Sequence, residues 1–221
     1  MSGQLSSEPI KHFLQSLKES SDSLKTANAV RVAKDFISAK KNAEIVAHYV
    51  IPALSDNQRL PQFYPVDGVF DGEITILAAQ GEFEPASVEL YSFADIDTVE
   101  AKVHPLTTMD GSRMPAESID LRVVKVWYQN GNAWNSYFSD TGLVPVPELL
   151  LHDENLITVD TVKKANYARV DYPGGSQFRW ISAPRRLEAG DFQPVAEPFS
   201  DASSLRPFSL SAGEFKQLLI T

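Results

Sequence analysis

The first fifty residues carry apolar side chains at helical spacing. Two sets recur at intervals of about three and four: Ile10, Phe13, Leu14 and Leu17, and then Val32, Ala33, Phe36 and Ile37. This spacing predicts a helix that begins near Ser7 and a second from about Asp22 to Ser38. A third helix through Ile45, Val46, Tyr49 and Val50 fits the same pattern, and Pro52 would end it. The sequence therefore predicts a helical N-terminal arm over residues 1–52.

Beyond Leu60 the pattern changes to short stretches that suit strands, with prolines between them. Ala86 to Phe93 alternates apolar and polar residues, and Ile119 to Tyr128 has a change of phase at Val123 and Val124 that indicates a bulge. The remaining predicted strands are Glu73 to Ala79, Leu156 to Val159, Tyr167 to Asp171, Phe178 to Ser182 and Glu214 to Thr221. Short strands separated by turns such as Pro173-Gly174-Gly175 are typical of an antiparallel β-sandwich. We therefore expect a mainly β fold, with a β-sandwich module over residues 53–221 behind the arm.

The chain ends on an apolar run, Leu218-Leu219-Ile220-Thr221, with no turn or polar tail after it. Such an end is expected of a sandwich that has been truncated at its C-terminal side. A terminal strand docked in a sheet is the alternative interpretation.

Composition excludes several classes of function. The formal net charge of −9 repels phosphate backbones, so nucleic acid is not expected as a partner. No apolar run approaches the roughly 20 residues that span a bilayer, and an acidic surface disfavours anionic membranes. There are no cysteines, which removes disulfides, thiolate metal sites and cysteine nucleophiles. No glycine-rich phosphate loop or serine-nucleophile elbow occurs.

Three stretches carry a resemblance to a known family. They are Gly81 to Ser87 (GEFEPAS), Asp120 to Tyr128 (DLRVVKVWY) and Pro147 to Leu156 (PELLLHDENL). With Asn166-Tyr167 and Trp180-Ile181-Ser182 after them, they resemble the N-terminal region of bacterial multidomain glycoside hydrolase-like proteins, relatives of the β-N-acetylgalactosaminidase group. The resemblance covers about Tyr49 to Thr221 and leaves out the helical arm, whose role it does not explain.

The resemblance implies a β-sandwich placed before a barrel-type catalytic domain. The catalytic acids would then lie beyond Thr221, where an adjacent acidic pair works with the acetamido group of the substrate. The downstream catalytic domain becomes the expected partner. An extracytoplasmic location, periplasmic or secreted, is also implied, although the polar residues Met1 to Ser7 do not form a signal peptide.

One aromatic group has the composition of a sugar-binding surface. Flat rings stack on the apolar faces of pyranoses while amides hold hydroxyl groups. The candidate carbohydrate-binding residues are Trp127, Tyr128, Trp134, Asn135 and Tyr137. The alternative is that Trp127 belongs to the core and that Gly131-Asn132 is a simple turn between two strands.

Clustered carboxylates suggest two further kinds of chemistry. Glu82 with Glu84, or Asp153 with Glu154, could supply the acid and base of a small glycosidase. The oxygen ligands of Asp153, Glu154, Asn155 and Asp160 could hold Ca²⁺. The alternatives are structural: Glu82 and Glu84 would accept backbone N–H bonds at a corner before Pro85, and the second group would form a polar turn.

The leading hypothesis is thus a non-catalytic ancillary module that braces a catalytic domain and could contact polysaccharide. A stand-alone carbohydrate-binding module is the next hypothesis, a small glycosidase is a third, and a structural protein whose arm docks a partner is a fourth. No cofactor is expected apart from Ca²⁺ at the carboxylate group.

Overall fold

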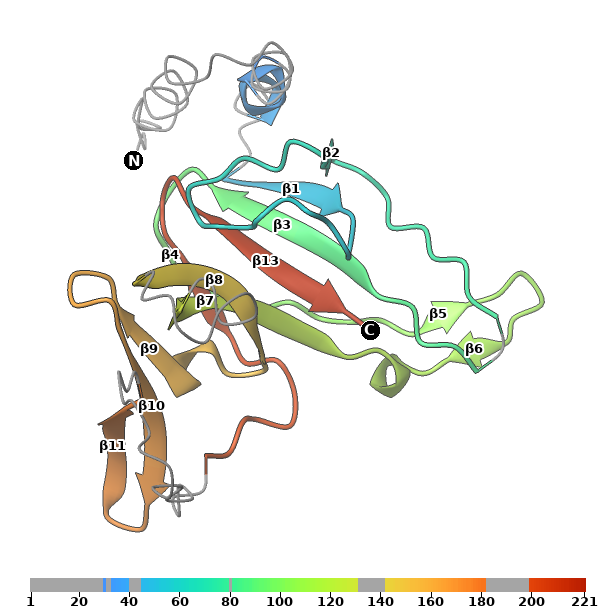
Figure 1. The fold of residues 1–221 in the computed structure, drawn as a ribbon. Coiled ribbons are helices and arrows are strands. Elements are labelled where there is room, and N and C mark those ends of the chain that lie inside the picture. The colour runs from blue at the N-terminus through green and yellow to red at the C-terminus, as the bar shows by residue number, and fades with distance from the viewer. Residues whose placement is uncertain (1–29, 31–32, 40–44, 80, 131–141, 182–198) are drawn as a thin grey trace, which may run out of the picture.

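The computed structural model describes residues 30, 33–39, 45–79, 81–130, 142–181 and 199–221. In this part of the chain a short helix, residues 33–39, precedes a mainly antiparallel β fold, as Figure 1 shows. The predicted fold class, a β-sandwich behind a short helical arm, is therefore confirmed. The predicted helix that begins near Ser7 lies outside the described residues. The described helix is too short and too polar to cross a membrane.

The largest described sheet has six strands in the order β2-β1-β3-β13-β7-β8, each antiparallel to its neighbours. These strands are β1 (Val46–Ile51), β2 (Val69–Phe70), β3 (Ala86–Ser92), β7 (Leu121–Asn130), β8 (Leu143–Leu151) and β13 (Phe215–Ile220). The last strand thus lies in the middle of the sheet, paired with β3 on one side and β7 on the other. The docked terminal strand, which was the alternative interpretation of the apolar end, is what the structure contains.

Three smaller sheets and two 3₁₀ helices complete the described elements. One sheet contains β9 (Ile157–Asp160), β10 (Ala165–Tyr172) and β11 (Gly175–Trp180), the second pairs β4 (Ile96–Val99) with β12 (Phe208–Leu210), and the third pairs β5 (Leu106–Thr107) with β6 (Arg113–Met114). The 3₁₀ helices are η1 (Ala116–Ser118) and η2 (Glu154–Leu156). The predicted turn joins β10 to β11, where Tyr172 pairs with Gly175.

Both faces of the six-stranded sheet bury apolar side chains. On one face Tyr91 of β3 stacks on Phe36 of the helix, with the ring centroids 4.4 Å apart. On the other face Leu218 of β13 packs against Phe208 and Leu210 of β12. The β4–β12 pair is therefore the second layer of the sandwich, and the helix covers part of the opposite face.

The predicted third helix is wrong, because residues 46–51 form β1. Ala47, Tyr49 and Ile51 are buried while the residues between them are partly exposed, which is the period of a strand. The apolar positions that fitted helical spacing, Val46 and Val50, face the other side of the sheet. The whole of β1 is paired with β3, so the sheet begins inside the predicted arm.

Three details of the strand prediction also differ from the structure. The predicted strand Glu73 to Ala79 is not a strand, because β2 pairs with β1 only at residues 69 and 70. Pro145 and Pro147 lie within β8 instead of separating strands, and an edge strand tolerates them because one side of it needs no ladder bonds. The bulge lies between Lys125 and Val126, two residues after the predicted position.

Candidate functional site

A cleft opens where strands β7 and β13 separate. The two strands are paired only from Leu218 opposite Val123 to Ile220 opposite Leu121. Beyond this point β7 continues with β8 away from β13, as Figure 1 shows. The resulting cleft has a volume of about 560 Å³ and is lined mainly by residues 59–62, 123–128 and 214–217. This volume is within the range of small-molecule sites.

A buried carboxyl group lies at one end of the cleft. Glu89 comes from β3, where it pairs with Tyr49 of β1 and Gln217 of β13. Its side chain is 1% exposed, and its Oε2 has no hydrogen-bond partner among the described residues. Burial raises the pKa of Glu89 to about 7, the positive charge of Arg59 opposes this effect, and the negative charge of Asp67 adds to it.

A buried ion pair supports this end of the cleft. Arg59 reaches Asp67 through both terminal nitrogens, with N–O distances of 2.6 and 2.7 Å. Ser55 and Asn57 also donate hydrogen bonds to the Asp67 carboxylate. Burial would raise the pKa of Asp67, but the hydrogen bonds from Arg59, Ser55 and Asn57 outweigh it and hold that pKa well below its usual range. The pair fixes Arg59, whose charge faces Glu89.

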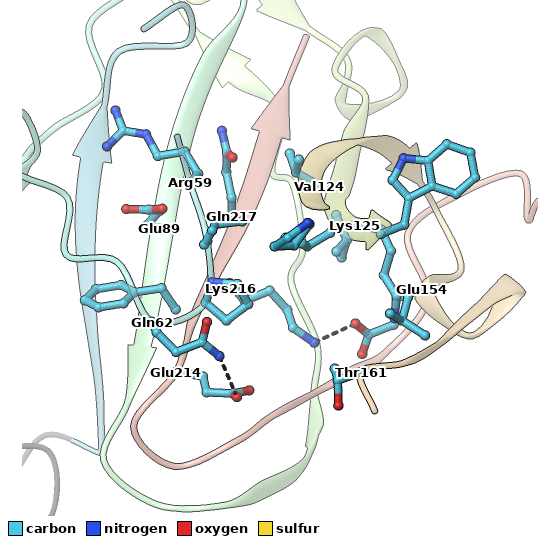
Figure 2. Close-up of a pocket in the computed structure, with 18 of the residues that line it drawn as sticks. Arg59, Gln62, Glu89, Val124, Lys125, Glu154, Thr161, Glu214, Lys216 and Gln217 are labelled. Carbon is cyan, nitrogen blue, oxygen red and sulfur yellow. Dashed lines mark hydrogen bonds and ion pairs between the residues drawn. The ribbon is translucent and has the colours of Figure 1, made fainter. Parts of the chain in front are cut away.

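Two lysines and a glutamate lie at the other end, as Figure 2 shows. The Nζ of Lys216 is 2.6 Å from Oε2 of Glu154, and it also donates to the carbonyl of Ser209. The Nζ of Lys125 has no hydrogen bond or ion pair of 4 Å or less to any described residue, although the backbone of Lys125 is paired with Leu149 of β8. Burial lowers the pKa of Lys125, the charge of Glu154 opposes this, and the charge of Lys216 lowers it further.

The predicted carbohydrate-binding residues divide into two groups. Trp127 and Tyr128 line the cleft, so the structure brings both to the candidate site. The indole Nε1 of Trp127 is 3.4 Å from Oε2 of Glu148. The backbone N and O of Tyr128 are bonded to the side-chain amide of Asn166, at 2.9 and 2.7 Å. Trp134, Asn135 and Tyr137 lie outside the described residues.

The predicted calcium ligands bond to protein groups in the structure. Asp153 caps η2 by accepting from the backbone N of Asn155 at 3.0 Å, and it pairs with Arg169 at 3.0 Å. Asp160 accepts from the backbone N of Lys163 at 2.8 Å. These contacts are those expected of a polar turn, which was the alternative interpretation. Among the described residues no group of three or more His, Asp or Glu side chains is placed to hold a metal ion, so the geometry lends calcium binding no support.

The two predicted acidic pairs are not equivalent. Glu82 and Glu84 are exposed in the segment before β3 and do not line the cleft. Glu82 accepts a hydrogen bond from the backbone N of Ala79 at 2.7 Å, in agreement with its structural interpretation. Asp153 and Glu154 are both buried and ion-paired, and of these two only Glu154 reaches the cleft.

Sequence reasoning missed Glu89, Lys125 and Lys216 as site residues. A local signal was present for all three, because each alternates with apolar residues on its own face of the strand: Glu89 with Tyr91, Lys125 with Val123, and Lys216 with Leu218. The separation of β7 from β13, which places Lys125 and Lys216 at one cleft, has no such local signal.

The cleft combines an indole and a phenol with side-chain amides, two ammonium groups, one guanidinium group and three carboxyl groups, those of Glu89, Glu154 and Glu214. This combination suits a ligand that has both apolar faces and many hydrogen-bonding groups. No family model, curated protein or solved structure matches the chain. The function is therefore inferred from the cleft and from the resemblance of the residues.

Proposed function

We propose that this chain is a non-catalytic β-sandwich module of a glycoside hydrolase-like protein and that it binds carbohydrate in the cleft between β7 and β13. The observation that carries the proposal is that Trp127 and Tyr128 line one cleft together with the amides of Gln62 and Gln217. Aromatic rings provide area for the apolar face of a sugar, and amides bond its hydroxyl groups.

The orientation of Gln217 supports a binding role. Its Nε2 donates to Oγ of Ser87 at 2.9 Å, and this hydroxyl donates in turn to the carbonyl of Leu218. Oε1 of Gln217 then has no partner among the described residues and can accept from a ligand. A side chain held in this way loses little conformational entropy when a ligand binds.

The positions of the carboxyl groups support a non-catalytic role. A glycosidase needs two carboxyl groups that face the scissile bond from opposite sides. Glu154 lines the cleft but is held by Lys216 and by the backbone N of Ser209. Glu89 pairs with Gln217 and Glu154 is held by the adjacent residue Lys216, so strand β13 lies between the two carboxyl groups, as Figure 2 shows, and they do not converge on one bond. The purified chain is expected to release no product from a panel of nitrophenyl glycosides, and measurable turnover would refute this part of the proposal.

A carbohydrate array followed by calorimetry tests the binding itself. Trp127→Ala should weaken binding of any sugar that the array identifies on the order of tenfold or more, because it removes an aromatic contact. Trp180→Ala is a matched control, since Trp180 lies on β11, is 55% exposed and does not line the cleft. Equal losses in the two variants, or no sugar bound by the native chain, would contradict the proposal.

The bracing role rests on an apolar surface at another part of the molecule. Leu77 and Phe83, between β2 and β3, are 94% and 87% exposed, and Leu106 and Met114 of the β5–β6 pair are also exposed. Large apolar side chains exposed to this degree are a feature of surfaces that contact another protein. Thr221 is bonded to Asp120 through two backbone hydrogen bonds, close in sequence to η1 and β6. We assign this surface to a catalytic domain encoded after Thr221.

The reading frame after Thr221 tests the bracing role first. A barrel-type domain with an adjacent acidic pair is expected there, and a stop codon would refute bracing while leaving carbohydrate binding untouched. In the longer protein, amide hydrogen exchange of residues 73–83 should be slower than in the isolated chain. Equal exchange in both proteins would show that the catalytic domain does not cover this surface.

A further inference from the structure

Two ionisable side chains line the cleft without a hydrogen bond or ion pair to any described residue. They are Lys125, whose ammonium group is partly buried, and Glu89, whose Oε2 is fully buried. The other buried ionisable side chains of the cleft are paired, Arg59 with Asp67 and Lys216 with Glu154. A buried polar atom without a partner, such as Oε2 of Glu89, destabilises a protein unless something else satisfies it. These two side chains therefore indicate where a ligand makes its polar contacts.

Lys125 specifies the charge of that ligand. Its ammonium group is partly buried near a second ammonium, that of Lys216, and both effects work against its positive charge. Glu154 is the nearest carboxylate that could offset them, but it is held by Lys216 at 2.6 Å and by the backbone N of Ser209 at 3.1 Å. An anionic group that enters the cleft would give Lys125 the ion pair that it lacks.

The other end of the cleft specifies hydroxyl groups. Figure 2 shows Glu89 with Arg59 and Gln217 on the side of β13 away from Lys125 and Glu154. Arg59 is already paired with Asp67 on two nitrogens, whereas the carboxyl group of Glu89 and Oε1 of Gln217 are acceptors without a partner among the described residues. Sugar hydroxyl groups are donors of the right kind for both.

We propose that the cleft binds an oligosaccharide bearing an anionic substituent, a carboxylate or a sulfate, which pairs with Lys125 while hydroxyl groups elsewhere on the same ligand donate to Glu89 and Gln217. The inference rests on the proposed carbohydrate function and names its ligand class. A negative charge at Glu89 would repel such a ligand. However, burial raises the pKa of Glu89 to about 7, so that much of the charge is absent near neutrality.

Calorimetry with size-matched sugars tests the ligand class. The three probes are a galacturonate trisaccharide, a sulfated galactose trisaccharide and a neutral galactose trisaccharide. At least one anionic probe should bind about tenfold to a hundredfold more tightly than the neutral one, as expected for hydrogen bonds to a charged group. The sulfate and carboxylate probes distinguish the two sources of negative charge.

Lys125→Gln should remove the preference for the anionic probe, so that the anionic and neutral probes bind this variant within about twofold of each other. Lys102→Gln makes the same change in net charge outside the cleft, at a lysine whose side chain is 72% exposed, and should keep the preference. Thermal unfolding checks that each variant is folded. The comparison of probes on the native chain needs no variant, so it holds even if Lys125→Gln does not fold.

The outcomes separate the two proposals. If the native chain binds neutral and anionic probes equally, the inference about Lys125 is overturned and the carbohydrate function stands. If the preference exists but survives in Lys125→Gln, another group binds the anion and the inference is again overturned. If neither these probes nor any sugar of the array binds, both proposals fail together.

Discussion

Replacing Glu89 with glutamine should make the protein more stable above neutral pH. The ordinary pKa of a glutamate is 4.5, whereas burial raises that of Glu89 to about 7 in the folded chain. Folding therefore favours the protonated carboxyl group. Below pH 4.5 both the folded and the unfolded chain are protonated at this site, so Glu89 carries no charge penalty there.

The penalty develops as the pH rises from 4.5 through 7. In this window the unfolded chain has lost the proton while the folded chain still holds it, so stability falls with rising pH. Above pH 7 the folded chain must bury a carboxylate that is 1% exposed. The difference in pKa corresponds to about 3 kcal/mol in the free energy of unfolding. Glutamine has the same shape and no charge, so Glu89→Gln should recover most of this amount at pH 8.

Urea denaturation at pH 4.5 and pH 8 measures the effect. The difference between Glu89→Gln and the native chain should be within about 1 kcal/mol at pH 4.5 and should grow to about 3 kcal/mol at pH 8. Taking the difference removes the effects of other titrating groups that are common to both proteins. Glu84→Gln, at an exposed position, is the control. A difference for Glu89→Gln that stays constant between the two pH values would refute the reasoning.

Three further changes test other contacts of the fold. Asp67→Ala should lower the free energy of unfolding by about 3–5 kcal/mol because it leaves Arg59 buried without a partner. Since the pKa of Asp67 is lowered in the folded chain, the native pair should contribute fully above about pH 5 and be lost in stronger acid. Phe36→Ala should cost about 3–5 kcal/mol by emptying the aromatic core under the helix. His152→Ala should lower the free energy of unfolding by about 1–3 kcal/mol. The buried ring is hydrogen-bonded to the carboxylate of Asp120, at 2.6 Å, and to the backbone carbonyl of Ala202, and the variant loses both bonds. Urea denaturation with a global fit to fluorescence and circular dichroism checks all three, and a loss below 0.5 kcal/mol at any site would contradict its account.

The strands with the clearest local pattern were predictable. Ala86 to Phe93 and Tyr167 to Asp171 alternate, and the structure contains β3 and β10 at these positions. Strand Val46–Ile51 was misread because its sequence fits two periods at once, and its pairing with β3 decided between them. Segment 73–79 has strand-like residues but forms no ladder, because β2 stops at Phe70. The local pattern shows which residues suit a strand, but a strand forms only where a neighbouring strand is available for backbone hydrogen bonds.

The candidate site was predictable only in part. Trp127 and Tyr128 were recognised from their chemistry, since aromatic residues beside amides suit a sugar wherever the fold places them. Glu89 and Lys125 were not, because a charged residue in a strand usually faces water. Their importance comes from burial and from missing partners, and neither property is visible along the chain.

The mainly β class, the positions of the principal strands and the absence of cysteine chemistry can all be predicted from the amino-acid sequence. They follow from side-chain alternation and composition, which are local properties. The position of β13 between β3 and β7, in contrast, is visible only in the folded protein. This insertion separates β13 from β7 beyond Leu218 and brings together residues up to 158 positions apart, Arg59 and Gln217 among them, around one cleft. Contacts between residues so distant depend on which strands pair, and the chain's own pattern does not specify that choice.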